Sequence, residues 1–212
     1  EKKLEKMKNL EKIKTFISES EQGTIFTTPE WLEAVAPGKW DYITNESAGS
    51  IKACMPIILN EKLGLTICNM PPFTQSLGVI YPKDDGKYAE VLTRRMNAMS
   101  ELISEIPKNS YFRQRLHPSI TNWLPFYWQD YNQSTRYTYI IKDLVNQDKI
   151  WKSFRSNIRQ EIRKASKTIE IMQEDDFDSL SFCIDSTFAR QKNKNFDFFT
   201  LKNIFNTCKI LK

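Results

Sequence analysis

Three strand-like apolar runs constrain the fold more than any other feature of the sequence. They cover residues 40–46, 51–59 and 63–69, and a Ser-Ala-Gly-Ser turn joins the first two. A helix is predicted at 85–106, where apolar residues recur at three- and four-residue steps before a proline. A further strand is expected at 110–117. Hairpin strands followed by a crossover helix predict an α/β (α+β) fold with a mixed sheet.

Two helices are expected before the sheet and one strand after it. Residues 3–18 carry apolar side chains at helical spacing. Thr28 is expected to cap a short helix that has Pro29 at its first position. A strand at 135–142 is expected to close the first half of the chain.

The positive charge of the protein is concentrated in one segment. The whole chain carries +5, whereas residues 149–168 hold seven Lys or Arg and a single acidic residue. Asp148 is expected to cap one continuous helix here, with an apolar stripe beginning at Trp151 and a basic stripe about 100° away around the helix. A local anionic partner is favoured over general coating of nucleic acid, and a solvated helix face is the alternative.

The last part of the sequence resembles the start of a second folding unit. A strand is predicted at 168–172 and helices at 176–189 and 200–211. These elements are too few to bury their own apolar surface, so two domains are expected, 1–145 and an apparently truncated 146–212. The apolar face of the last helix is expected to be covered by another chain, as in a homo-oligomer formed through it, or to be exposed because further residues are missing.

Composition excludes several classes of protein. Hydrophobic residues make up 40%, aromatic residues 12% and charged residues 27%, which is typical of a folded protein rather than a disordered one. The longest charge-free run, 63–82, contains three prolines, so no transmembrane segment is expected. One histidine and four cysteines lack metal-ligand spacing. No metal is therefore expected, and the cysteines are interpreted as core thiols of a cytoplasmic protein.

Four short patches carry a family resemblance. They are Phe26-Thr-Thr-Pro-Glu-Trp-Leu32, Met70-Pro-Pro-Phe-Thr-Gln-Ser-Leu-Gly78, Trp151-Lys-Ser-Phe-Arg-Ser-Asn-Ile-Arg-Gln-Glu-Ile-Arg-Lys-Ala165 and Ser186-Thr-Phe-Ala-Arg-Gln191. Together they resemble the FemAB-like branch of the GNAT acyltransferase superfamily, whose members carry two GNAT-like units in tandem. The resemblance implies a GNAT-like mixed sheet flanked by helices. The opening helices and strand of a second, incomplete GNAT-like unit would follow it.

The resemblance implies an N-acyltransferase. The donor would be an acyl-CoA, such as acetyl-CoA, or an aminoacyl-tRNA, and the acceptor an amine of a peptidoglycan precursor, a sugar or another small molecule. tRNA is then a further partner. An amine held beside a thioester or ester can attack it directly, and alignment supplies much of the rate. No protein nucleophile is needed, and no catalytic residue is assigned.

Two groups of residues are predicted to bind ligands. In the Pro-rich loop, Phe73 and Gln75 are expected to project into a cleft, and Gly78 belongs to the nearest match to the GNAT phosphate-binding turn. That match ends on Ile80 where the family has a small residue, so this unit is expected not to bind CoA in the usual way. The corresponding turn of the second unit is expected beyond Lys212.

Arginines of the basic stripe form the second group. Arg155, Arg159 and Arg163 are expected to face the cleft between the two units and to contact CoA, a nucleotide-linked sugar or tRNA. The resemblance alone implies that Arg190 faces the acyl site, while His117 is a weaker candidate for a general base. Two alternatives stay open: a non-catalytic GNAT-like module that binds a ligand or partner, and an RNA-binding domain built on the basic helix.

Overall fold

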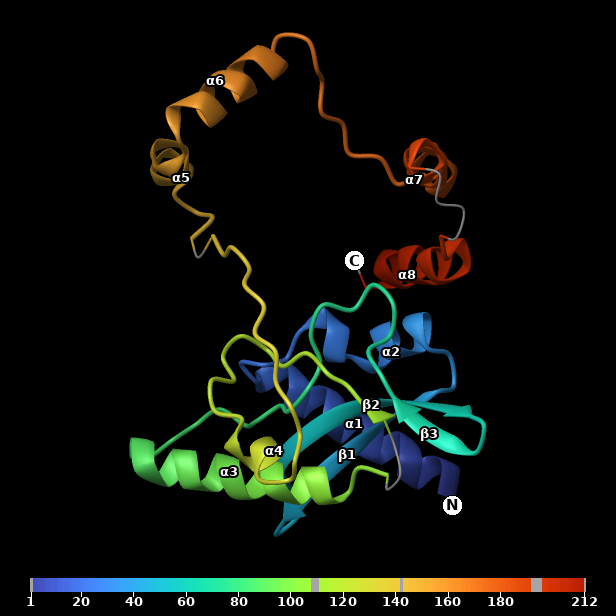
Figure 1. Ribbon diagram of the computed structural model, residues 1–212, viewed down its shortest axis with the longest axis vertical. Coiled ribbons are helices and arrows are strands. Elements are labelled where there is room, and N and C mark those ends of the chain that lie inside the picture. Colours follow the sequence, from blue (N-terminus) through green and yellow to red (C-terminus); the bar gives the residue numbers. More distant parts are fainter. Residues whose placement is uncertain (1, 108–110, 142, 192–195, 212) are drawn as a thin grey trace. The chain divides into compact units, whose positions relative to one another are not determined.

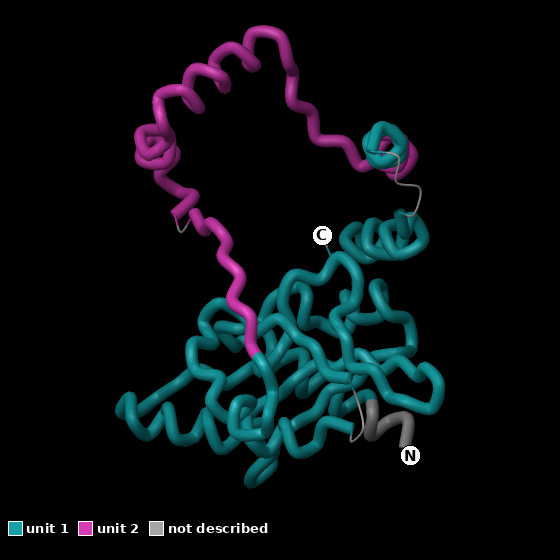
Figure 2. The backbone as a smooth tube through the Cα atoms, in the orientation of Figure 1, with its two compact units in different colours: residues 1–132, 184–212 teal, residues 133–183 magenta. Residues whose placement is uncertain are grey.

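The computed structural model describes residues 2–107, 111–141, 143–191 and 196–211 (Figure 1). The chain forms two compact units (Figure 2). Unit 1 comprises residues 1–132 and 184–212, and unit 2 comprises residues 133–183. The boundaries of these compact units differ from the domain boundary expected at residue 145. That expectation concerned two GNAT-like domains, and it stays a prediction.

Four strands and the helices around them make up the ordered elements. In chain order they are α1 (Lys2–Glu19), the 3-10 turn η1 (Ile25–Thr27), α2 (Pro29–Val35), β1 (Trp40–Ser47), β2 (Ser50–Lys62), β3 (Leu65–Cys68), α3 (Tyr88–Ser104), β4 (Tyr111–Phe112), α4 (Leu124–Tyr127), α5 (Gln147–Ser153), α6 (Ser156–Ala165), α7 (Phe177–Arg190) and α8 (Phe198–Ile210). The sheet order is β1-β2-β3-β4. The first three strands are antiparallel, and β4 runs parallel to β3 after the crossover helix α3. The predicted mixed α+β fold is confirmed.

Two tight turns fix the register of the antiparallel strands. Ala48 and Gly49 have φ values of 50° and 76°, and Leu63 and Gly64 have 53° and 75°. Two consecutive left-handed residues suit a two-residue hairpin, because the twist of such a turn matches that of the paired strands. The first turn is the predicted one. The second lets β2 continue to Lys62, three residues beyond its predicted end.

Strand β2 is buried on both faces. Ala53, Met55 and Ile57 pack against α3, whereas Cys54 packs against α1 and Ile58 against α2. Successive side chains of a strand point to opposite faces, so one continuous apolar run supplies both halves of the core. Figure 1 shows α1 and α3 running alongside the β1–β2 hairpin.

Helix α2 is capped as predicted, and α8 packs against it. The Thr28 side chain accepts a hydrogen bond from the backbone N–H of Trp31 at 3.3 Å, and Pro29 occupies the first turn. Ile204 and Cys208 of α8 pack against the apolar cluster of α2. The expectation that the chain itself leaves the α8 face uncovered is therefore wrong for these residues. Assembly through this helix stays a prediction.

Strand β4 is much shorter than the predicted 110–117, of which residue 110 lies outside the described residues. Just beyond Phe112, the Arg113 N–H still donates to the carbonyl of Cys68, the last residue of β3, at 2.8 Å. Farther on, the Leu77 N–H of the loop after β3 donates to the Arg115 carbonyl, also at 2.8 Å. From Arg115 on, a loop rather than a strand is the hydrogen-bonding partner of this segment.

Two predicted strands of the later chain are wrong. Residues 135–141 and 168–172 have no regular structure, and residue 142 lies outside the described residues. Tyr137 and Tyr139 alternate with polar residues as in a strand, but both side chains are more than 90% exposed. A strand forms where a neighbouring strand pairs with its backbone, and no described strand pairs with either segment.

Gly78 lets the loop approach the segment that follows β4. Its φ is 95°, and a Cβ atom at this position would lie 2.5 Å from Leu116 Cδ2. Leu77 and Leu116 form an isolated parallel bridge at this point. A side chain at residue 78 would require either the Leu116 side chain or the loop to shift.

Replacing Gly78 with Ala is expected to destabilise unit 1 more than replacing Gly64 with Ala. Both glycines have positive φ, which costs an alanine about 1–2 kcal/mol. Only Gly78 adds a steric clash, worth a further ~1–3 kcal/mol, because nothing lies within 4 Å of a Cβ at Gly64. Urea unfolding of the two variants measures the difference. Equal losses of stability would contradict the close approach.

Candidate functional site

A cavity of about 600 Å³ lies where β3 and β4 end. It is larger than a cavity of about 350 Å³ that lies beside Phe16 and Pro82. The larger cavity is lined by Phe26, Asn69, Met70, Pro71, Pro72, Phe73, Thr74, Gln75, Arg113 and Arg115. Open sheets with parallel strands bind ligands beyond the carboxyl ends of those strands. The parallel pair β3–β4 places this cavity at such an edge.

The wall formed by the Pro-rich loop is fixed by one buried side chain. Thr74 is 5% exposed, and its hydroxyl accepts a hydrogen bond from Trp31 Nε1 at 3.0 Å and donates one to the Pro72 carbonyl at 3.1 Å. The preceding residue, Phe73, has φ 55°, a conformation uncommon outside glycine. Because Thr74 and the two prolines hold the loop on both sides, this backbone conformation persists and presents the Phe73 ring at the cavity.

Two predicted binding residues lie in the cavity wall, and one does not. Phe73 and Gln75 line the cavity, and Gln75 is exposed. Gly78 belongs to the same loop, but it is buried beside Leu116 and does not line the cavity. The binding roles of all three residues stay predictions.

Arg113 and Arg115 were not predicted from the sequence, although they supply the charge of the cavity. Both are exposed, whereas Phe112, Gln114 and Leu116 between and beside them are half-buried. The signal was present in the alternation of this segment, because side chains two apart on an extended chain share a face. No carboxylate is among the lining residues, so the described wall is cationic.

The basic segment of unit 2 is two helices, not the one continuous helix predicted. α5 ends at Ser153 and α6 begins at Ser156, with Phe154 and Arg155 in extended conformations. The Ser153 hydroxyl donates to the Ile150 carbonyl at 2.6 Å and competes with the helical hydrogen bonds there. The cap of α5 is Asn146, whose side chain accepts from the Lys149 N–H, rather than Asp148.

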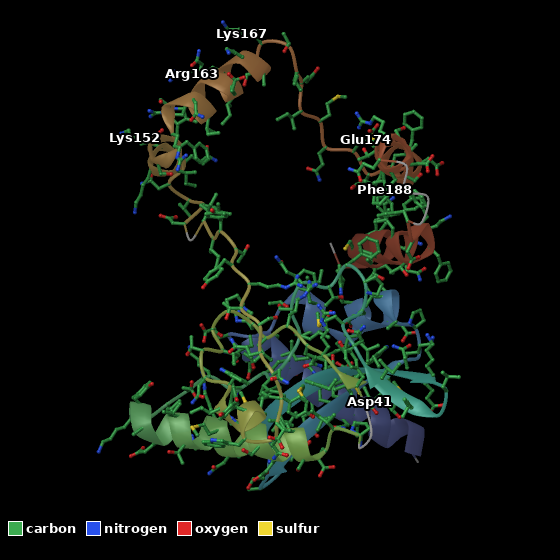
Figure 3. The ribbon with its side chains drawn as sticks, in the orientation of Figure 1. Asp41, Lys152, Arg163, Lys167, Glu174 and Phe188 are labelled. Carbon is green, nitrogen blue, oxygen red and sulfur yellow. The ribbon has the colours of Figure 1, made fainter. Side chains whose placement is uncertain are left out.

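The three predicted arginines of this segment differ in their surroundings. Arg155 is the N-cap residue of α6, while Arg159 and Arg163 lie one turn apart on it. The Arg163 guanidinium lies over the Trp151 ring, 5.5 Å from its centroid. Figure 3 shows Lys152 on α5 and Arg163 on α6. The basic row is thus divided between two helices, and its contact with an anionic ligand stays a prediction.

The remaining candidates lie outside the residues that line the cavity. Arg190 ends α7 and makes a 3.4 Å hydrogen bond to Thr187 Oγ1. His117 Nδ1 accepts a hydrogen bond from the Ser119 N–H at 3.2 Å, which ties the ring to its own turn. Burial raises the pKa of the Cys54 thiol, so this group stays protonated. The prediction of four core thiols is wrong for Cys183, which is exposed.

Within the described ranges, no group of three or more His, Cys, Asp or Glu side chains is placed to hold a metal ion. Over the same residues, no helix combines the length and apolar character needed to cross a bilayer.

The fold is similar to that of FemX. Its crystal structure matches 91% of this chain with a TM-score of 0.58 and 16% sequence identity. The chain spans about half the length of FemX, since the match covers 52% of that protein. No protein-family model and no curated protein matches the sequence. The comparison therefore shows a FemAB-like fold and leaves the activity to be proposed.

Replacing Trp31 with Phe is expected to loosen the cavity wall. The change removes the indole N–H and leaves the buried Thr74 oxygen without its donor, at a cost of about 1–3 kcal/mol. Trp40→Phe is the matched control, because its indole donates to the exposed Glu33 carboxylate at 2.6 Å. Urea unfolding is expected to show the larger loss for Trp31→Phe. A larger loss for Trp40→Phe would show that the Thr74 contact does not anchor the loop.

Proposed function

We propose that this chain belongs to an acyl- or aminoacyltransferase of the FemAB-like type that acts on an amine of a peptidoglycan precursor. The observation that carries the proposal is the fold, since the similarity to FemX extends over 91% of the chain. The four patches that resemble the FemAB-like branch of the GNAT superfamily support it independently. Because the chain spans about half of FemX, the proposal concerns the activity of the protein that contains it.

The cavity of unit 1 is assigned to the acceptor. Its loop lacks the final small residue of a GNAT phosphate turn, and Ile80 stands there instead. A donor such as acyl-CoA or aminoacyl-tRNA would therefore bind outside this loop. The exposed Gln75 amide can donate and accept hydrogen bonds, and the rings of Phe26 and Phe73 offer apolar contact. The wall thus suits a ligand with both polar and apolar parts.

The reaction requires alignment more than a protein nucleophile. The acceptor amine attacks the carbonyl carbon of the donor, a C–N bond forms and the C–S or C–O bond to the carrier breaks. The proton that the amine loses passes to the departing thiolate or ribose oxygen. Holding both reactants in place can contribute about 7–11 kcal/mol to such a step.

The basic residues of unit 2 are assigned to the donor. Arg155 and Lys167 are exposed and Arg159 is half-buried, and none of the three has an acidic partner among the described residues. Guanidinium groups bind phosphate in a bidentate manner, and phosphates are common to CoA and tRNA. The assignment predicts donor binding that weakens as salt increases.

Activity is tested by mass spectrometry of a peptidoglycan precursor incubated with acetyl-CoA or with aminoacyl-tRNA. The protein containing this chain is expected to add one acyl or aminoacyl group. Gln75→Ala is expected to lower kcat/KM roughly 3- to 10-fold through loss of hydrogen bonding. Gln129→Ala is the matched control, because Gln129 is exposed and does not line the cavity.

Two outcomes would contradict the proposal. A protein that binds the precursor but transfers no group from either donor would be a non-catalytic binding module. A protein that binds RNA with a steep salt dependence and does not bind the precursor would be an RNA-binding domain.

A further inference from the structure

The guanidinium groups of two arginines in the cavity wall have no partner among the described residues. Neither Arg113 nor Arg115 makes a side-chain hydrogen bond or ion pair with another described residue. The other arginines of unit 1 do have partners: Arg94 pairs with Asp85, Arg95 with Asp84, and Arg190 with Thr187. The unpaired guanidinium groups of unit 1 are thus the two that face the cavity.

The backbone holds both arginines in fixed positions. The N–H of Arg113 donates to the Cys68 carbonyl, and the carbonyl of Arg115 accepts from the Leu77 N–H. Gln114 between them is anchored from the opposite face, because its Nε2 donates to the Pro56 carbonyl at 2.7 Å. Two residues of extended chain span about 6.6 Å, so both guanidinium groups can reach one polyatomic anion.

The chemistry of the wall suits an oxyanion. Guanidinium stays charged at every physiological pH, and its planar set of donors matches the oxygens of a carboxylate or phosphate. No acidic side chain among the ten lining residues competes for the pair. Phe26 and Phe73 line the same cavity, so an apolar or planar group attached to the anion would contact a ring.

We infer that Arg113 and Arg115 form an oxyanion-binding subsite that recognises a carboxylate or a phosphate ester of the ligand bound in this cavity. The inference rests on the proposed function only in taking that ligand to be the acceptor. Binding of the anion requires no transfer step and can be measured without a donor.

An NMR titration at constant ionic strength tests the subsite. Inorganic phosphate and succinate are the two probes, and the Nε–Hε resonances of the arginines report contact. Both arginine resonances are expected to shift in the unaltered protein. Replacing Arg113 and Arg115 together with Gln is expected to weaken binding of the better probe by about tenfold or more, because two charge-assisted contacts are lost.

The matched control is Arg94→Gln. Arg94 lies on α3, outside the cavity, and pairs with the fully exposed Asp85. Replacing it removes one positive charge from unit 1 without changing the cavity, and so tests whether net charge alone affects anion binding. The control is expected to bind both probes as the unaltered protein does. A stronger response to phosphate would identify a phosphate ester as the recognised group, and a stronger response to succinate would identify a carboxylate.

Three results would overturn the subsite. They are no shift of either arginine resonance with either probe, unchanged binding in a folded double variant, and an equal loss in Arg94→Gln. Failure of the proposed function looks different, since a protein without transferase activity would still bind the probes. Conversely, transfer with unchanged kinetics in the double variant would remove the subsite and keep the activity.

Discussion

The backbone pairing of the segment after β4 with the end of β3 and with the loop that follows it is the contact on which the cavity depends. Two hydrogen bonds make it: the Arg113 N–H donates to Cys68, the last residue of β3, and the Leu77 N–H of the loop donates to the Arg115 carbonyl. They bring a Pro-rich loop and a cationic strand extension to the same edge of the sheet. Gly78 makes the approach sterically possible, and Thr74 fixes the far side of the loop to α2 through Trp31. Without this pairing, the aromatic and cationic walls would separate.

Much of the architecture of unit 1 could be predicted because its signals are local. The Ser-Ala-Gly-Ser turn, the Thr28 cap and the apolar period of α3 depend on neighbours within a few residues, and each is present in the structure. One continuous basic helix after Asp148 was predicted for the same kind of reason, yet it breaks at Phe154. The Ser153 hydroxyl competes with the backbone for the Ile150 carbonyl. In the sequence, this serine cannot be told apart from one that lies within an unbroken helix.

Features that depend on distant partners could not be predicted in this way. Residues 135–141 have the alternation of a strand but no described strand pairs with them, and sequence pattern does not reveal a missing partner. The packing of α8 on α2 joins residues far apart in the chain. Arg113 and Arg115 line the cavity only because the distant Pro-rich loop forms its opposite wall. Phe73 and Gln75 could be recognised as candidates for binding because they belong to that unusual loop itself.

Hydrogen–deuterium exchange of the protein with and without a nucleotide-linked peptidoglycan precursor tests most directly whether the cavity binds the acceptor. If the cavity at the β3–β4 edge holds the acceptor, exchange should slow at backbone amides of residues 73–77 and 111–116. These two segments should respond together, since the hydrogen bond from the Leu77 N–H to the Arg115 carbonyl joins them. Unchanged exchange in both segments, with slowing confined to residues 147–165 of unit 2, would contradict the assignment of the cavity.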